Sequence, residues 1–212
     1  MTEEAGELEP EPVEAEAVFG AQLPLVRRYA ADLAARGVEL GLIGPLEPAR
    51  LWTRHVLNSG LIAPLLPQGA SVADVGSGAG LPGLVLAATR PDCAVTLIEP
   101  MERRVAWLEE EAARLGLGVR VVRARAEEYR DERFDVVTAR AVGALAKLLP
   151  LTVPLARPGG RLALMKGASV ADELAKADRV VRRLKLTDVH VEIVGAGMAS
   201  LETRVVVATV PL

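Results

Sequence analysis

One stretch of the sequence decides the fold: Val72-Ala73-Asp74-Val75-Gly76-Ser77-Gly78-Ala79-Gly80-Leu81-Pro82-Gly83. It leads from an apolar strand, through an acidic residue, into a loop with four glycines. Glycine lets backbone amides approach a ligand closely, and it tolerates the positive φ angles of a tight strand-to-helix turn. Pro82 suits the first turn of the helix that follows, where its missing N–H is no loss. The stretch therefore predicts a turn that binds a cofactor.

The turn alone leaves the type of cofactor open. Residues 78–83 also fit the G-x-G-x-x-G pattern of dinucleotide-binding proteins. Glu99 follows the next predicted strand, where an acid can accept hydrogen bonds from the ribose hydroxyls of either a dinucleotide or adenosylmethionine. In the alternative interpretation, Glu99 only caps a helix that begins near Met101. Both cofactors therefore remain candidates at this point.

The pattern downstream of Ser71 predicts an α/β fold with a mostly parallel sheet. Short β-branched runs alternate with helical patterns, as in βαβ units. Strands are expected at 71–75, 94–98, 119–123, 134–139, 161–165, 187–194 and 203–210, and helices near 82–90, 101–115, 144–156 and 170–184. No helical pattern separates the last two strands, so they should pair as an antiparallel hairpin at the sheet edge. A seven-stranded sheet whose last strand is antiparallel resembles the class I adenosylmethionine-dependent methyltransferase fold.

The remaining segments suggest three parts. Residues 1–17 hold seven glutamates and no Lys or Arg, which is the composition of a disordered acidic tail. Residues 18–70 carry two helical patterns, at 23–35 and 49–66, and should form an N-terminal helical cap. Residues 71–212 then form the Rossmann-like domain, in one compact unit with the cap. Without the tail, the 25 basic side chains outnumber the rest of the 28 acidic ones, so the body is mildly basic and compatible with an anionic partner.

Composition excludes several classes of protein. A single cysteine, Cys93, rules out an internal disulfide, and only His55 and His190 are available as histidine ligands, so no metal site is expected. No apolar run reaches the ~20 residues of a membrane helix, and no signal peptide is recognisable. We therefore expect a cytoplasmic protein without a metal or a membrane partner, and a monomer.

Two further positions favour adenosylmethionine over a dinucleotide. Asp74 places a carboxylate near the end of its strand, where it would repel a pyrophosphate but could meet a cationic cofactor, unless it only binds loop amides. After the third strand, Ala126 and Glu127 could flank an adenine and accept a hydrogen bond from its amine. The alternative is that Glu127 simply stabilises the positive end of a short helix.

Several blocks together resemble one known family. They are the glycine turn with Leu81-Pro82-Gly83, Arg125-Ala126-Glu127, Ala139-Arg140-Ala141, Lys166-Gly167 and, upstream, Arg54-His55. In this order they closely resemble the bacterial glucose-inhibited division protein B family, over residues ~20 to 210. The chain departs from the family pattern at 41–45, at 58–60 and at Arg103-Arg104, which replaces a lysine pair.

The resemblance implies a function and a set of site residues. The family methylates nitrogen 7 of a guanine in 16S ribosomal RNA, with S-adenosylmethionine as donor, so 16S rRNA or a precursor of the small subunit is the expected partner. By resemblance, Gly76 and Leu81 lie against the cofactor, Ala126 and Glu127 hold its adenine end, and Arg140 lines the site. Gly78, Gly80, Asp74 and Glu99 complete the expected cofactor set.

The expected reaction needs no general base. Nitrogen 7 of guanine has an in-plane lone pair and no proton, so catalysis is mainly positioning. Arg140, Lys166 and Arg125 follow three different strands and are the candidates for positioning the base or contacting RNA. The alternatives are an NAD-dependent reductase, a small-molecule methyltransferase and a non-catalytic RNA-binding module.

Overall fold

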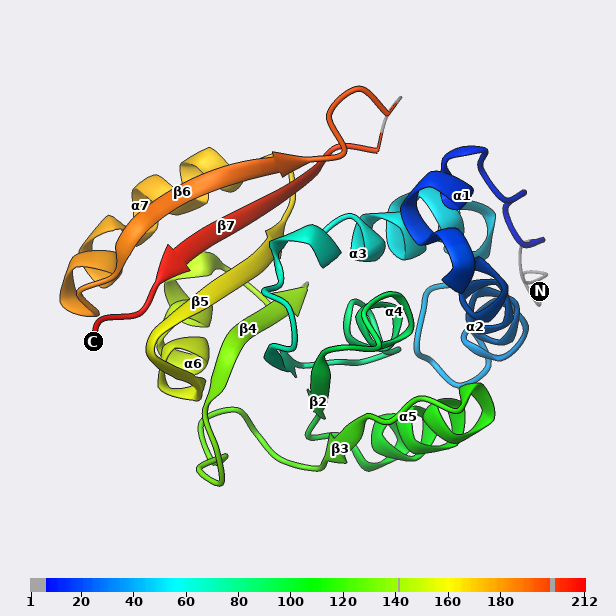
Figure 1. The fold of residues 1–212 in the computed structure, drawn as a ribbon, viewed down its shortest axis with the longest axis horizontal. Coiled ribbons are helices and arrows are strands. Elements are labelled where there is room, and N and C mark those ends of the chain that lie inside the picture. Colours follow the sequence, from blue (N-terminus) through cyan, green and yellow to red (C-terminus); the bar gives the residue numbers. More distant parts are fainter. Residues whose placement is uncertain (1–6, 141, 199–200) are drawn as a thin grey trace.

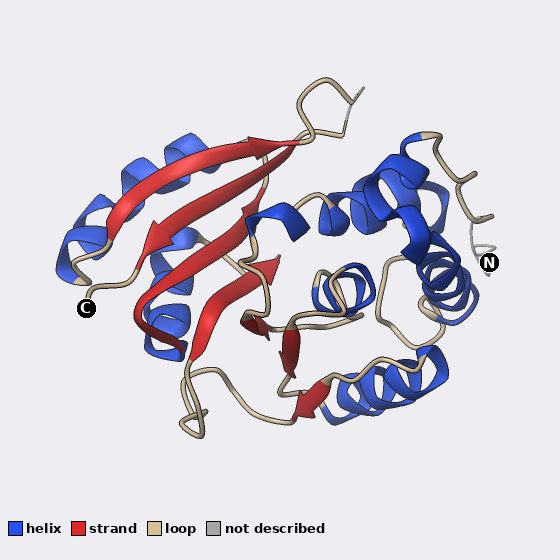
Figure 2. Cartoon of the chain, viewed as in Figure 1, coloured by secondary structure: helices blue, strands red, loops and turns tan. Residues whose placement is uncertain are grey.

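The computed structural model describes residues 7–140, 142–198 and 201–212, which form an α/β sandwich around one sheet (Figures 1 and 2). The sheet has seven strands in the order β3-β2-β1-β4-β5-β7-β6. The strands are β1 (Ser71–Val75), β2 (Ala94–Ile98), β3 (Arg120–Val122), β4 (Phe134–Arg140), β5 (Ala156–Lys166), β6 (Thr187–Val194) and β7 (Thr203–Thr209). The described α-helices are α1 (Glu14–Phe19), α2 (Leu23–Arg36), α3 (Asn58–Gly60), α4 (Gly83–Thr89), α5 (Glu102–Leu115), α6 (Leu145–Thr152) and α7 (Val170–Arg183).

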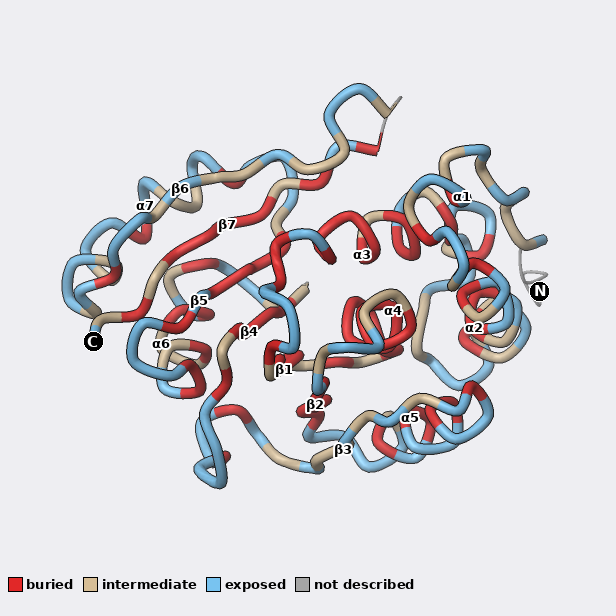
Figure 3. The backbone as a smooth tube through the Cα atoms, in the orientation of Figure 1, coloured by how far each residue is buried: buried red, intermediate tan, exposed pale blue. Residues whose placement is uncertain are grey.

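Two apolar cores lie on the two faces of the sheet. One contains buried side chains of α2, α4 and α5 together with the cap, and the other contains those of α6 and α7. The middle strands are buried along almost their whole length, while α7 and β6 expose many residues (Figure 3). Central strands covered on both faces are expected to read as continuous apolar runs, which is why β1 and β4 were recognisable from sequence.

The predicted sheet is confirmed, including its antiparallel end. β1 to β5 pair in parallel, and β7 runs antiparallel to both β5 and β6. β7 therefore inserts between β5 and β6, so that β6 forms this edge of the sheet and β3 forms the other. β5 begins five residues earlier than the predicted Arg161, and its register with β4 shifts between Phe134 and Val136. The turn at Gly159, with φ of +73°, accommodates this irregular start.

The strand registers gather the site at one edge of the sheet. Val75 at the end of β1 lies opposite Ile98 of β2 and Ala139 of β4. The residues that follow, Gly76, Glu99 and Arg140, therefore meet beyond the carboxyl ends of neighbouring strands. The chain crosses from β2 and β3 on one side of β1 to β4 on the other, and ligands of open α/β sheets bind at such a reversal of strand order.

The single cap helix predicted at 49–66 is confirmed only in part. Residues 48–60 are helical without a break, as a 3₁₀ turn (Pro48–Arg50), a π-helical turn (Trp52–Leu57) and α3, and a separate 3₁₀ turn (Ala63–Leu65) follows. α3 ends at Gly60, where a Cβ would lie 2.4 Å from Cε1 of Phe19. The close approach of α1 therefore requires glycine at this end of the helix.

The expectation of a disordered tail does not hold for residues 7–17, while residues 1–6 lie outside the described residues. Glu9 accepts hydrogen bonds from the Thr53 backbone N–H (2.9 Å) and hydroxyl (2.8 Å). Glu11 forms an ion pair with Arg27 at 2.6 Å, which lowers the pKa of this carboxyl. The prediction of disorder rested on the high charge of this segment. In the structure, α1 also buries apolar side chains against the cap, and this burial orders the segment.

One buried acid makes the stability of the fold depend on pH. Glu111 of α5 is fully buried, and neither of its oxygens has a hydrogen-bond partner within the described part of the chain. Burial, and then the nearby Asp32 carboxylate of α2, raise its pKa to about 7. A carboxyl with a raised pKa contributes stability that is present below its ordinary pKa and is lost as the pH rises through about 7.

We therefore expect Glu111→Gln to stabilise the protein above neutral pH. The free energy of unfolding should rise by about 2 kcal/mol near pH 8, and the gain should shrink toward about pH 5. Thermal unfolding of both proteins across this range measures the effect. Glu109→Gln, an exposed substitution on the same helix, is the control and should show no such pH-dependent gain. Equal effects of the two substitutions would contradict the assignment.

Candidate functional site

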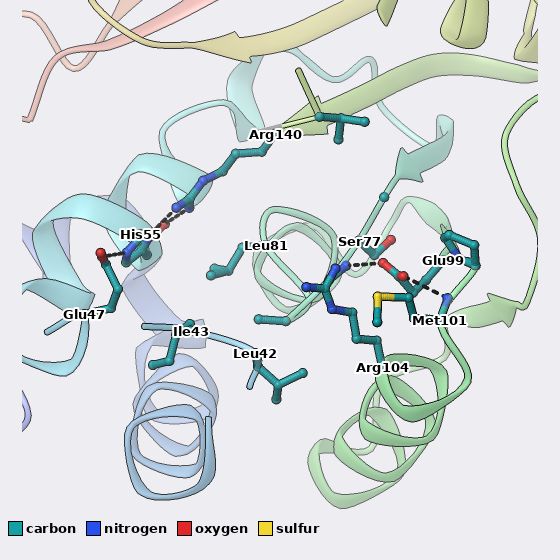
Figure 4. A pocket seen from close by; sticks show the side chains of 15 residues that line it. Leu42, Ile43, Glu47, His55, Ser77, Leu81, Glu99, Met101, Arg104 and Arg140 are labelled. Carbon is teal, nitrogen blue, oxygen red and sulfur yellow. Dashed lines mark hydrogen bonds and ion pairs between the residues drawn. The ribbon is translucent and has the colours of Figure 1, made fainter. Parts of the chain in front are cut away.

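A cavity of about 480 Å³ opens where the glycine turn, the cap and the end of β4 meet (Figure 4). Its size is that of a small-molecule site. The lining comes from four segments, namely the cap (Leu42, Ile43, Glu47, His55), the turn (Gly76, Ser77, Gly78, Ala79, Leu81), the end of β2 with the start of α5 (Glu99, Pro100, Met101, Arg104), and the end of β4 (Arg140, Val142).

The backbone of the turn has the conformation that its glycines predict. Gly78 has φ of +57°, and a Cβ there would have only the Gly76 carbonyl oxygen, at 3.7 Å, within contact distance. Gly78 therefore faces open space and lets its backbone border the cavity. Gly80 does not line the cavity. Glycine is needed there because φ is +101° and because a Cβ would lie 2.4 Å from the Leu84 side chain.

Glu99 combines the two roles that the sequence left open. Its side chain is 1% exposed and lines the cavity. Oε2 accepts the Gly78 N–H at 2.9 Å, and Oε1 accepts the Met101 N–H at 3.0 Å, just before α5 begins. Each carboxylate oxygen has a second lone pair, so Glu99 can still accept hydrogen bonds from a ligand hydroxyl.

The predicted contact between Asp74 and the cofactor is not what the structure shows. Asp74 is completely buried and does not line the cavity. Its Oδ2 accepts the Gly83 N–H at 3.0 Å, which is the alternative role of binding loop amides. Burial raises the pKa of this carboxyl to about 7. Asp74 thus ties the end of β1 to the start of α4 beneath the turn.

Arg140 is held by the cap across the cavity. Its Nη1 donates to the His55 carbonyl oxygen at 3.2 Å and to Oγ of Ser59 at 3.4 Å, and its Nη2 contacts Nδ1 of His55. Nε2 of His55 in turn contacts Glu47 (Figure 4). Burial lowers the pKa of the Arg140 guanidinium. Arg140 thus lies at the site, as predicted, and two cap residues, His55 and Ser59, contact its guanidinium.

A second cavity, of about 430 Å³, shares the walls formed by His55 and Arg140. Lys166 lines it with a side chain that is only 9% exposed. The Lys166 ammonium lies 2.7 Å from Oε2 of Glu173 and donates to the Gly143 carbonyl at 2.7 Å. The other lining residues are Arg54, Asn58, Met165, Gly167, Ser169, Glu202, Thr203 and Arg204. The Lys166 side chain is therefore largely enclosed in a polar cavity and is not a solvent-exposed lysine at the end of a strand.

Besides Asp74 and Gly80, three further predicted residues line neither cavity. Ala126 belongs to the core on the α6 and α7 face, while Arg125 and Glu127 are exposed and lie 3.9 Å apart. Their predicted roles at the adenine and at RNA stay predictions. Ala141, of the block at 139–141, lies outside the described residues.

Sequence reasoning gave no site role to three lining residues with ionisable side chains, Glu47, His55 and Arg104. His55 entered only as part of the Arg54-His55 block, and Arg104 only as part of the Arg103-Arg104 pair. The signal for His55 was its rarity, because the chain has two histidines. No local pattern marked Glu47. Among the described residues, no group of three metal-ligating side chains could hold a metal ion, and none of the helices in these ranges could span a bilayer.

The chain matches known proteins along most of its length. A family model described as rRNA small subunit methyltransferase G matches residues 22–202. A relative from Clavibacter sepedonicus, named ribosomal RNA small subunit methyltransferase G, is 57% identical over 96% of this chain and 97% of its own. A relative of the same name from Mycobacterium sp. (strain KMS) is 49% identical over 93% of this chain and 89% of its own.

Solved structures share the fold at low sequence identity. A SAM-dependent O-methyltransferase from Thermotoga maritima gives a TM-score of 0.57 at 20% identity, and covers 73% of this chain and 65% of its own. A ribosomal protein L11 methylase from Lactobacillus delbrueckii subsp. bulgaricus gives 0.56 at 17% identity, over 74% of this chain and 77% of its own. The class I methyltransferase fold expected from sequence is thereby confirmed.

Proposed function

The chain belongs to the rRNA small subunit methyltransferase G family, and on this premise we propose that it transfers a methyl group from S-adenosylmethionine to nitrogen 7 of a guanine in 16S rRNA. The observation that carries the proposal is the cavity at the carboxyl edge of the sheet, lined by the glycine turn and Glu99. An enzyme with this substrate works where ribosomes are assembled, so we place it in the cytoplasm. The family match does not favour an NAD-dependent reductase.

The residues present fit the adenosyl part of the proposed cofactor. The turn leaves room for a ligand beside the backbone of Gly78, because a Cβ placed there would meet no side chain. Glu99 retains lone pairs for ribose hydroxyls at the wall of the same cavity. Bound there, the cofactor would supply an electrophilic methyl group on its sulfonium sulfur.

The protein's part in the reaction is to place the accepting base. Guanine nitrogen 7 carries a lone pair and no proton, so no side chain has to remove one. Arg140 stands between the two cavities and can donate to the base oxygen O6 or to a phosphate, while Lys166 supplies a second positive charge in the adjoining cavity. Orientation of this kind is worth up to roughly 7–11 kcal/mol in well-oriented systems.

Methyl incorporation tests the proposal directly. Purified protein with labelled S-adenosylmethionine should modify 30S particles or naked 16S rRNA, and mapping of the product should place the label on nitrogen 7 of one guanine. Absence of incorporation in both substrates over a range of salt and magnesium would contradict the proposal. Incorporation into a small molecule alone would favour a small-molecule methyltransferase instead.

We expect Lys166→Ala to lower RNA methylation about tenfold, which corresponds to ~1.4 kcal/mol, without changing the affinity for S-adenosylmethionine. The reason is the loss of a positive charge from the second cavity. Glu173→Gln is the matched control, because it weakens the same ion pair but keeps the lysine charge. If both variants lost the same activity, Lys166 would act only through its pairing with Glu173.

A further inference from the structure

The wall shared by the two cavities is one continuous chain of polar side chains. It runs from Glu47, just before the 3₁₀ turn Pro48–Arg50, through His55 in the π-helical turn, to Arg140 at the end of β4 (Figure 4). His55 and Arg140 are the residues that line both cavities. These two side chains therefore stand at the boundary between the cavities.

The chemistry of Arg140 and Glu47 determines which ring nitrogen of His55 carries the proton. A guanidinium has donors and no acceptor, so Nδ1 of His55 must accept from Nη2 of Arg140. A carboxylate only accepts, so Nε2 of His55 must donate to Glu47. Both contacts are satisfied together only by a neutral imidazole with its proton on Nε2. The negative charge of Glu47 then selects the tautomer that Arg140 requires.

His55 also binds Arg140 through its backbone. The carbonyl oxygen of His55 accepts Nη1 of Arg140 at 3.2 Å, and it accepts the Ser59 hydroxyl at 2.7 Å. One residue thus receives both terminal nitrogens of the guanidinium, and this fixes the plane of the group. The contact comes from a π-helical turn, and such turns often occur at functional sites.

We propose that His55 is a positioning residue that orients the Arg140 guanidinium between the two cavities, in the Nε2–H tautomer selected by Glu47. Arg140 can then present its remaining donor capacity to the RNA substrate from a fixed position at the wall of both cavities. The inference rests on the proposed function for what Arg140 contacts, but the tautomer follows from the protein alone.

The tautomer can be read by nitrogen NMR of the imidazoles in the full-length protein. The chain has two histidines, and Nδ1 of His190 lies 2.7 Å from the Asp188 carbonyl oxygen, so that ring must donate from Nδ1. We expect opposite patterns near pH 7.5, about one unit above the ordinary histidine pKa: an unprotonated Nδ1 for His55 and a protonated Nδ1 for His190. His190→Gln assigns the signals. A protonated Nδ1 on His55 would overturn the proposal.

Two isosteric substitutions test the positioning role. In His55→Asn, the amide oxygen can take the place of Nδ1 and accept from Arg140, whereas in His55→Gln the polar group lies near Nε2 and reaches only Glu47. We expect His55→Gln to lower kcat for methyl transfer about tenfold at unchanged affinity for S-adenosylmethionine, and His55→Asn to retain most of the rate. Equal losses in both variants would overturn the proposal.

A double-mutant cycle shows whether His55 acts through Arg140. Adding His55→Gln to Arg140→Lys should cost little further rate, because the group that His55 orients is already gone. Fully multiplicative losses would overturn the positioning role. The NMR result needs no substrate, so a wild type that fails to methylate RNA would contradict the proposed function, while the histidine tautomer would still support or overturn the inference independently.

Discussion

Gly78→Val is expected to abolish binding of S-adenosylmethionine, with a loss of at least about 100-fold in affinity, or ~2.7 kcal/mol. Gly78 borders the cavity with φ of +57°, a region that a β-branched residue rarely adopts. The valine would both strain the turn and place methyl groups where the backbone faces the cofactor. Calorimetric titration with S-adenosylmethionine measures the loss.

Gly69→Val is a closely matched control for this experiment. Gly69 has φ of +66° with nothing near its Cβ position, and its N–H donates to the Asp92 carboxylate at 2.9 Å, as that of Gly78 does to Glu99. It does not line the cavity. The two variants should lose similar stability, but only Gly78→Val should lose the cofactor. Cofactor affinity retained in Gly78→Val would show that the turn does not contact the ligand.

The second large effect is expected at Arg140. In Arg140→Lys, a single ammonium replaces a planar group that meets His55 twice and Ser59 once. It cannot keep these contacts and also hold the RNA substrate. We expect kcat for RNA methylation to fall about 100-fold, similar to the loss of one transition-state donor in other enzymes. Single-turnover methylation of 30S particles measures the change.

Arg157→Lys is the control for Arg140→Lys. Arg157 forms an exposed ion pair with Asp135 at 2.7 Å, and Asp135 binds Ser71 at the beginning of β1, at the other end of the strand from the glycine turn. This substitution should leave methylation unchanged. Should Arg140→Lys lose affinity for S-adenosylmethionine instead of rate, Arg140 would belong to the cofactor site alone.

Much of the sheet was predictable because its signals are local. The bounds of β1, β2 and β6 agree with the predicted ranges, since each is a short apolar or alternating run between turn residues. In the cap, α2 at Leu23–Arg36 agrees with the predicted range 23–35, but the end of the second helix was not predictable in this way. That helix ends at Gly60, which packs against Phe19, a residue far away in sequence. Likewise, residues 7–17 looked like a solvated tail until their apolar side chains were placed against the cap.

The candidate site was also predictable only where local motifs mark its residues. Gly76, Gly78, Leu81, Glu99 and Arg140 all line the first cavity, as their positions in the motifs predicted. They follow the ends of parallel strands, and such ends meet at one edge of the sheet whatever the rest of the chain does. Ala126, from the same family resemblance, lies instead in the core on the opposite face.

By itself, the sequence determined the family, the class of fold and the glycine turn, because short-range patterns of apolar residues and glycines specify strands and tight turns. Only the tertiary structure decided that Asp74 is buried under the turn and that Glu47 and His55 join Arg140 at the wall between two cavities. The physical reason is distance along the chain: His55 and Arg140 are 85 residues apart, and their contact depends on how the cap packs against the sheet.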